Sequence, residues 1–260
     1  MTLKTVQSAD GTAIAYERFG DGPALVLVMG AFCDRSAPRG LAALLSRDFA
    51  VFTYDRRGRG ASGDTPPYAV EREIEDLDAM ISETGGAAFV FGHSSGAVLA
   101  LEAAASGLPI RKLAVYEPPY IVDNTRVRPR KMGERVSTLI GSGQRSEAVR
   151  LFLAEGPEVP AEVIAAMENG PGWSDMEAIA HTLPYDLAIC GDQVLPSGRL
   201  AEIDVPTLAL SGGASPAWAR NAVDEVAATI EGAQHVSLDG QTHGAADDVL
   251  APVLVEFFLS

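Results

Sequence analysis

The sequence predicts an α/β fold with a mostly parallel, doubly wound sheet and a helical insertion. Three observations predict it. Short apolar runs alternate with helical patterns along the first part of the chain. Ala24–Met29 is apolar throughout, as expected of a central parallel strand that is covered on both faces. The alternation stops after Tyr120 and resumes at Val205, which places the helical insertion between two parts of one sheet.

The composition suits one large domain, or a core domain with an insertion. The 260 residues are 47% hydrophobic, and the two cysteines are too far apart to suggest a disulfide framework or a metal site. A net charge of −15 argues against nucleic acid and anionic membranes as partners. Met1–Asp10 lacks the basic start and apolar stretch of a secretory signal, and no apolar run approaches membrane length, so we expect a cytoplasmic protein. The sequence does not indicate an oligomeric state.

The first part of the chain begins with a hairpin. Asp10-Gly11 separates two strand-like runs, a strong signal for a tight turn. Arginines and glycines fill residues 55–62, but their spacing fits neither a Walker loop nor a dinucleotide fingerprint. We therefore expect a structural loop held by arginine hydrogen bonds. The strands and helices expected around these turns are Thr2–Ser8, Thr12–Phe19, Ala24–Met29, Arg39–Ser46 and Phe49–Tyr54.

Val70–Glu83 has the pattern of an amphipathic helix. Its apolar residues form one stripe, and five acidic residues lie mostly off that stripe: Glu71, Glu73, Glu75, Asp76 and Asp78. No histidine or cysteine joins them, so the pattern does not indicate a metal site. We expect a solvated acidic face.

The stretch from Gly92 to Gly96 carries the clearest chemical signal. It follows a strand-like run, Ala87–Phe91, and precedes a helical run, Ala97–Ala105. Gly-x-Ser-x-Gly between a strand and a helix is the sequence form of a nucleophile elbow, in which Ser94 points out of the sheet above free backbone N–H groups. The alternative is a glycine-rich turn whose serine only caps a helix.

The second part of the chain contains the insertion and the end of the sheet. A strand over Arg111–Tyr116 ends at Glu117, and two prolines follow it. We predict a core of residues 1–117 and 203–260, interrupted by helices over residues 118–202. The helices expected in the insertion are Arg145–Leu153, Ala161–Glu168 and Asp175–Thr182, with breaks that include Pro184. Strands over Val205–Leu210 and Gln234–Leu238 follow, with a helix after each.

A serine nucleophile needs a base, and His243 is the best candidate among the four histidines. It lies in the loop that leaves the last predicted strand, at the edge of the sheet where Ser94 emerges. His93 is expected to pack, His181 lies in the insertion, and His235 lies within a strand. The alternative for His243 is an ordinary surface-loop histidine.

These features resemble the α/β-hydrolase superfamily, of the serine hydrolase type with a helical cap domain. The segments that carry the resemblance are Leu25–Gly30, Tyr54–Ser62, Gly92–Gly96 and Gln241–Gly244. The resemblance implies an α/β-hydrolase fold in which residues 118–202 form the cap. It also implies an oxyanion hole made by the backbone N–H groups of Ala31 and Ser95. Many members have His-Gly where this chain has Met29-Gly30.

The third member of the catalytic triad departs from the family pattern. The family usually places an aspartate after the strand that follows the cap, but this chain has Ser215 there, which cannot carry the charge that stabilises an imidazolium. Some members take the acid from the end of the preceding strand, where this chain has Glu117. We therefore predict a triad of Ser94, Glu117 and His243. Glu117 could instead be a hinge residue or a solvated carboxylate, and Asp204, Asp224 and Asp239 are weaker candidates.

The sequence thus predicts a serine hydrolase that acts by acyl transfer on a small-molecule ester or thioester with an apolar portion. No metal or organic cofactor is implied. Serine at the elbow disfavours the haloalkane dehalogenase and epoxide hydrolase chemistries of the superfamily, which use aspartate there. The alternatives are a carbon–carbon bond hydrolase, a lyase or a haloperoxidase-like perhydrolase on the same residues. A further alternative is a non-catalytic binding protein, which the serine at position 215 supports.

Overall fold

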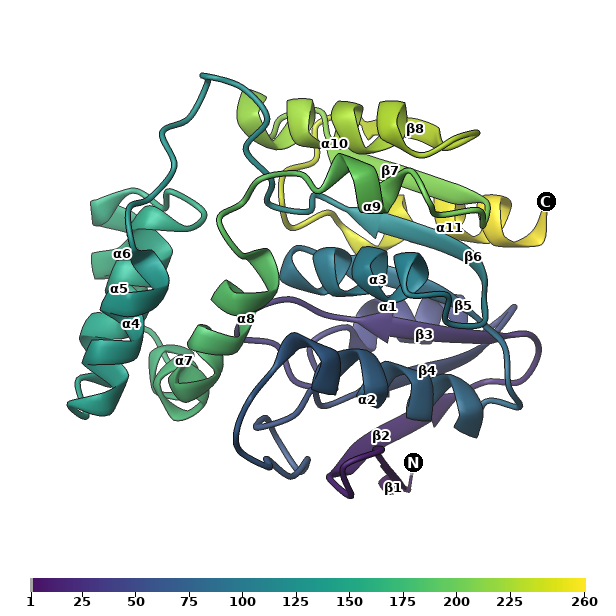
Figure 1. The fold of residues 1–260 in the computed structure, drawn as a ribbon, viewed down its shortest axis with the longest axis horizontal. Helices are drawn as coiled ribbons and strands as arrows, with labels where there is room; N and C mark the ends of the chain where they lie inside the picture. Colours follow the sequence, from purple (N-terminus) through teal and green to yellow (C-terminus); the bar gives the residue numbers. More distant parts are fainter. Residues whose placement is uncertain (1) are drawn as a thin grey trace.

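The computed structural model describes residues 2–260 and contains one eight-stranded sheet (Figure 1). Its strand order is β1-β2-β4-β3-β5-β6-β7-β8. β2 pairs antiparallel with β1 and with β4, and all other neighbours are parallel, which confirms the predicted sheet. The strands are β1 (Lys4–Gln7), β2 (Ala13–Phe19), β3 (Ala24–Val28), β4 (Ala50–Tyr54), β5 (Ala88–His93), β6 (Ile110–Tyr116), β7 (Thr207–Gly212) and β8 (Gln234–Leu238).

Helices cover both faces of the sheet. α1 (Arg39–Leu45) and α11 (Asp247–Leu259) lie on one face, and α2 (Val70–Glu83), α3 (Ser95–Ala105) and α10 (Ala217–Thr229) lie on the other (Figure 1). Successive side chains of a strand point to opposite faces. Leu25 and Val26 of β3 are accordingly both fully buried, each in a different apolar cluster. This double cover explains why the central strands have continuous apolar sequences.

Most of the helical insertion, residues 118–202, lies beyond the carboxyl ends of the parallel strands, but its last helix, α9 (Ser197–Leu200), lies beside α3 and α10 (Figure 1). It has its own apolar cluster, to which Val136, Val149 and Leu183 contribute, and the loop after β3 packs against that cluster through Ala31 and Phe32. Its elements are α4 (Met132–Gly141), α5 (Arg145–Glu155), α6 (Ala161–Glu168), α7 (Trp173–Ile179), a 3₁₀ turn η1 (Ala180–Thr182), α8 (Leu183–Cys190) and α9 (Ser197–Leu200). Across residues 2–260, every helix falls short of the length and apolarity that a membrane span needs.

The insertion differs in detail from the sequence prediction. α4 was not predicted, because its sequence contains glycine and β-branched residues of low helix propensity and owes its order to tertiary packing. Asp175–Thr182 is not one helix, since α7 ends at Ile179 and a 3₁₀ turn follows. Pro184 does not end a helix but lies in the first turn of α8, where its missing N–H costs no intrahelical hydrogen bond.

The predicted solvated acidic face of α2 is wrong for two of its five residues. Glu73 and Asp76 are each only 1% exposed. Glu73 accepts two hydrogen bonds from Arg56, and Asp76 accepts two from Arg57. Buried carboxylates need such partners. The helix therefore directs these two carboxylates toward the arginine-rich loop after β4, and not toward water.

Candidate active site

Ser94 lies on a strained turn between β5 and α3. Its backbone has φ 57° and ψ −125°, a region that residues with a side chain rarely adopt. A Cβ atom on Gly96 would lie 2.2 Å from the carbonyl oxygen of Val28, and one on Gly92 would lie 2.7 Å from the Cα atom of Ala97. The turn therefore requires glycine at both of these positions. The turn brings Ser94 to the wall of a cavity.

Glu117 follows β6 directly and also has a positive φ, of 45°. Its carboxylate accepts a hydrogen bond from Nδ1 of His243 at 2.7 Å and another from the backbone N–H of Gly212 at 2.8 Å. Burial alone would raise the pKa of Glu117, but the hydrogen bonds from His243 and Gly212, together with the nearby Ser215 hydroxyl, lower that pKa below its usual value of 4.5. Glu117 is thus a buried anion aimed at the imidazole, and not a solvated carboxylate.

Two side chains hold the backbone carbonyls of Thr242 and His243 in the loop that carries the imidazole. The Tyr116 hydroxyl donates to the carbonyl of Thr242 at 2.6 Å, and Nε2 of His93 donates to the carbonyl of His243 at 2.8 Å. Since Nδ1 of His243 is committed to Glu117, Nε2 is the ring nitrogen left to accept a proton. Within residues 2–260 no hydrogen bond joins this ring to the Ser94 hydroxyl. Catalytic hydrogen bonds of this kind often tighten only when substrate binds.

Ser94, Glu117 and His243 all line one cavity of about 230 Å³. The three residues come from the loops after β5, β6 and β8, whose carboxyl ends meet at one edge of the sheet. The insertion supplies the opposite wall, through apolar side chains that include Met132, Phe152, Leu153 and Leu187. Ser94, Glu117 and His243 therefore gather on the core side of a mainly apolar cavity, an arrangement typical of small-molecule sites.

Ala31 and Ser95, the predicted oxyanion donors, line the same cavity. The loop after β3 passes directly against the nucleophile turn, since a Cβ atom on Gly30 would lie 2.8 Å from Cβ of Ser94. Ser95 is the first residue of α3, so its N–H has no intrahelical acceptor. Neither backbone N–H donates to any group in the described part of the chain. The N–H groups of Ala31 and Ser95 are thus two free donors in segments that adjoin Ser94.

The loop of residues 55–62 is held by arginine hydrogen bonds, as predicted. Arg56, Arg57 and Arg59 are each at most 2% exposed. Sequence reasoning missed one of their partners, Asp186 in α8, whose side chain is also 1% exposed and lines the cavity. A single carboxylate within the apolar helix LPYDLAIC is a signal that could have been noticed, because an isolated charge among buried residues requires partners.

The other candidates lie outside this constellation. Ser215 is buried against Glu117 without a hydrogen bond of good geometry, although its hydroxyl contributes to the lowered pKa of that carboxyl. His181 contacts the carbonyl of Gly58, and His235 lies next to Asp224. No set of three or more histidine, cysteine or acidic side chains converges as metal ligands anywhere in residues 2–260.

Comparison with known proteins shows one consistent similarity. A sequence model described as the alpha/beta hydrolase family matches residues 15–253. The crystal structure of an alpha/beta hydrolase from Sphaerobacter thermophilus is 57% identical, covers 98% of this chain and 100% of its own, and superimposes with a TM-score of 0.95.

Two curated relatives match more locally. N-formylmaleamate deformylase of Pseudomonas putida is 31% identical over 154 residues, which are 56% of this chain and 58% of that protein. The uncharacterised hydrolase YraK of Bacillus subtilis is 29% identical over 146 residues, 55% of this chain and 54% of its own. The chain thus spans little more than half the length of the curated relatives it matches.

Proposed function

The chain belongs to the alpha/beta hydrolase family, and we propose that within it the protein is a serine hydrolase acting by acyl transfer on a small-molecule ester or thioester. One observation carries the proposal. A buried carboxylate, an imidazole and a serine on a strained turn line the same cavity, and the carboxylate binds the imidazole at 2.7 Å. This is the arrangement by which a base is oriented toward a nucleophile.

In the proposed acylation step, Nε2 of His243 takes the Ser94 proton as Oγ attacks the carbonyl carbon. Glu117 stays ionised, keeps the proton of Nδ1 in place and stabilises the imidazolium that forms. The backbone N–H groups of Ala31 and Ser95 donate to the negative oxygen of the tetrahedral intermediate. His243 then gives its proton to the oxygen or sulfur of the leaving group, which departs as an alcohol or thiol. The acyl group stays bound to Ser94.

In the proposed deacylation step, a water molecule takes the place of the leaving group. His243 removes a proton from the water, whose oxygen attacks the acyl carbon, and the same two N–H groups stabilise the second intermediate. When that intermediate collapses, the proton returns to the oxygen of Ser94 and the carboxylic acid is released. All proton transfers in this cycle pass through one ring nitrogen of His243.

We propose that residues 118–202 act as a cap that selects the acyl group, over a core of residues 1–117 and 203–260. The apolar wall that this insertion presents to the cavity supports a substrate with an apolar portion. The cavity volume of about 230 Å³ favours short acyl chains over long ones. The strongly acidic chain, with a net charge of −15, supports a small molecule and not nucleic acid as the partner.

The test is a panel of p-nitrophenyl esters of increasing acyl length, together with matched thioesters. We expect turnover that is highest for short acyl groups and absent in Ser94→Ala. A fluorophosphonate probe should label Ser94 in the native protein, because only an activated serine reacts with it. Without labelling or turnover, the proposal fails and a binding protein is favoured. Turnover of a carbon–carbon substrate or peracid formation, with no ester hydrolysis, would reassign the reaction on the same residues.

A further inference from the structure

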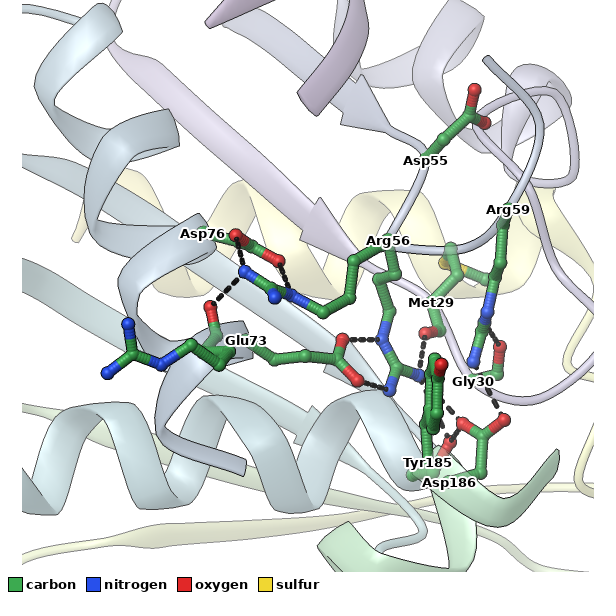
Figure 2. A network of polar contacts seen from close by, with 12 residues as sticks. Met29, Gly30, Asp55, Arg56, Arg59, Glu73, Asp76, Tyr185 and Asp186 are labelled. Carbon is green, nitrogen blue, oxygen red and sulfur yellow. Dashed lines mark hydrogen bonds and ion pairs between the residues drawn. The ribbon is translucent and has the colours of Figure 1, made fainter. Parts of the chain in front are cut away.

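Two of the buried arginines in the loop after β4 meet at one carboxylate from the insertion. Oδ1 of Asp186 accepts a hydrogen bond from Nη1 of Arg56 at 2.8 Å, and Oδ2 accepts one from Nη2 of Arg59 at 2.7 Å (Figure 2). Glu73 of α2 pairs with the other edge of Arg56, at 2.6 and 2.8 Å. Two cations and two anions thus form a neutral cluster, which is how charged groups are tolerated in an interior.

The same two arginines hold the loop that carries Ala31. Nη1 of Arg59 donates to the carbonyl of Gly30 at 2.6 Å, and Nη1 of Arg56 donates to the carbonyl of Met29 at 3.2 Å (Figure 2). The carbonyl of Gly30 and the N–H of Ala31 belong to one peptide unit. That unit is planar and trans, so the carbonyl and the N–H point in opposite directions. By fixing the carbonyl, Arg59 fixes the direction of the Ala31 N–H on the other side of the peptide.

Asp186 holds the second donor as well. The Ser95 hydroxyl donates to Oδ1 of Asp186 at 2.7 Å, and that carboxylate is only 1% exposed. The contact ties the first residue of α3 to α8, and with it the N–H that lies next to Ser94. Both backbone donors therefore belong to segments that one side chain of the insertion holds in place, one directly and the other through two arginines.

We propose that Asp186 is a positioning residue that sets the geometry of the oxyanion hole and couples the insertion to the catalytic core. The inference rests on the proposed function, because it assigns Ala31 and Ser95 as donors. Donors stabilise a developing oxyanion strongly only when they are held in the required orientation before the reaction starts. Asp186 does not touch the substrate in this scheme, and it acts only through Arg56, Arg59 and Ser95.

The chain offers a matched control in Asp76. It is also buried at 1%, and it also accepts two hydrogen bonds, at 2.8 and 2.7 Å, from an arginine of the same loop, Arg57. Asp76 contacts neither the loop after β3 nor Ser95. If Asp186 has only a structural role, loss of its charge should affect catalysis no more than loss of the charge of Asp76. If it positions the donors, loss of its charge should affect catalysis more.

The test compares Asp186→Asn with Asp76→Asn, using a short p-nitrophenyl ester. We expect Asp186→Asn to lower kcat by about 10- to 100-fold, since loss of a whole oxyanion donor costs about 10²- to 10³-fold. KM should stay within about threefold, because the oxyanion forms only after substrate binds. Affinity for a trifluoromethyl ketone, which forms a tetrahedral adduct on Ser94, should fall by a factor similar to that for kcat. Asp76→Asn should leave kcat and ketone affinity as in the native protein.

Each result decides the inference. If Asp186→Asn keeps native kcat, or if Asp76→Asn lowers kcat equally, the positioning role is overturned. If Asp186→Asn does not fold, Ser95→Ala decides, because it removes the hydroxyl contact but keeps the backbone N–H and leaves no buried charge unpaired. For Ser95→Ala we expect a several-fold lower kcat at constant KM. An unchanged kcat in this variant overturns the inference. Failure of the proposed function is distinct, since the native protein would then neither turn over esters nor react with fluorophosphonate.

Discussion

The two sides of the candidate site are built by different means. On the histidine side, Glu117 pairs with His243, backbone groups hold both residues, and no lysine or arginine of residues 2–260 forms an ion pair with either. On the oxyanion side, two arginines and two carboxylates form a buried ionic cluster. In the proposed reaction a proton enters and leaves the histidine side, and a buried cation there would oppose it. The proposed reaction moves no proton on the oxyanion side, so permanently charged guanidinium groups can serve there as rigid supports.

The comparison also shows which part of the chain each side depends on. Every hydrogen bond described for the histidine side comes from the core, at the ends of β5, β6, β7 and β8. The oxyanion side requires Asp186 from the insertion. We therefore expect changes in the insertion to alter stabilisation of the intermediate, and changes at the core strand ends to alter proton transfer. The predictions below test this division.

The largest effect is expected from His243→Ala, because it removes the base itself and no other group can replace it. Turnover of a short ester should fall by about 10⁶-fold, as in a serine hydrolase whose base is deleted. His235→Ala is the matched control, since His235 lies in β8 away from the cavity. It should retain native turnover. If His243→Ala lost only a little turnover, the base would be another residue. The contrast between a proton-transfer side and an oxyanion side would then fail.

Glu117→Gln should have the next largest effect, a loss of about 10³- to 10⁴-fold in kcat, because the amide can favour the wrong tautomer of His243 and cannot stabilise the imidazolium. Near-ultraviolet circular dichroism should show preserved folding. Ser215→Ala should change kcat by less than about threefold, since that hydroxyl makes no hydrogen bond of good geometry. Full activity of Glu117→Gln would contradict the assignment of the acid.

A smaller effect is expected from Tyr116→Phe, which removes only the hydroxyl that holds the carbonyl of Thr242. The loop that carries His243 loses one of the two hydrogen bonds to the carbonyls of Thr242 and His243, and we expect kcat to fall by about 10-fold through misplacement of the ring. KM should stay constant. If Tyr116→Phe bound the ketone and the substrate less tightly by the same factor, the hydroxyl would also shape the cavity. That result would contradict a role limited to the histidine side.

The smallest effect concerns the dependence of stability on pH. Burial, and then repulsion from His243, lower the pKa of His93 from 6.5 to about 4. The unfolded chain therefore binds the proton more readily than the folded protein between these values. The free energy of unfolding should fall as the pH is lowered from 6.5 toward 4, by at most about 1.4 kcal/mol per pH unit from this group. In His93→Gln, urea unfolding at several pH values should show a shallower slope, and an unchanged slope would contradict the shift.

The sequence predicted much of the fold because the signals for it are local. The apolar run of β3, the Asp10-Gly11 hairpin and the amphipathic pattern of α2 each depend on a few neighbouring residues. The turn around Ser94 could be identified for the same reason. Helix α4 could not, because its weak propensity is overridden by packing within the insertion. The candidate site divides in the same way: Ser94 lies in a local sequence pattern, and the role of Asp186 depends on tertiary packing.

By itself, the sequence determined the strands of the sheet, the turn at Ser94 and the strand ends at which Glu117 and His243 lie. The signals for these features come from neighbouring residues and do not depend on a distant partner. Only the tertiary structure decided that Glu73 and Asp76 face inward, and that Asp186 meets Arg56 across 130 residues of chain. A buried charge is tolerated only beside its counter-charge, and the identity of that counter-charge depends on which distant segments pack together. No local pattern of residues contains that information.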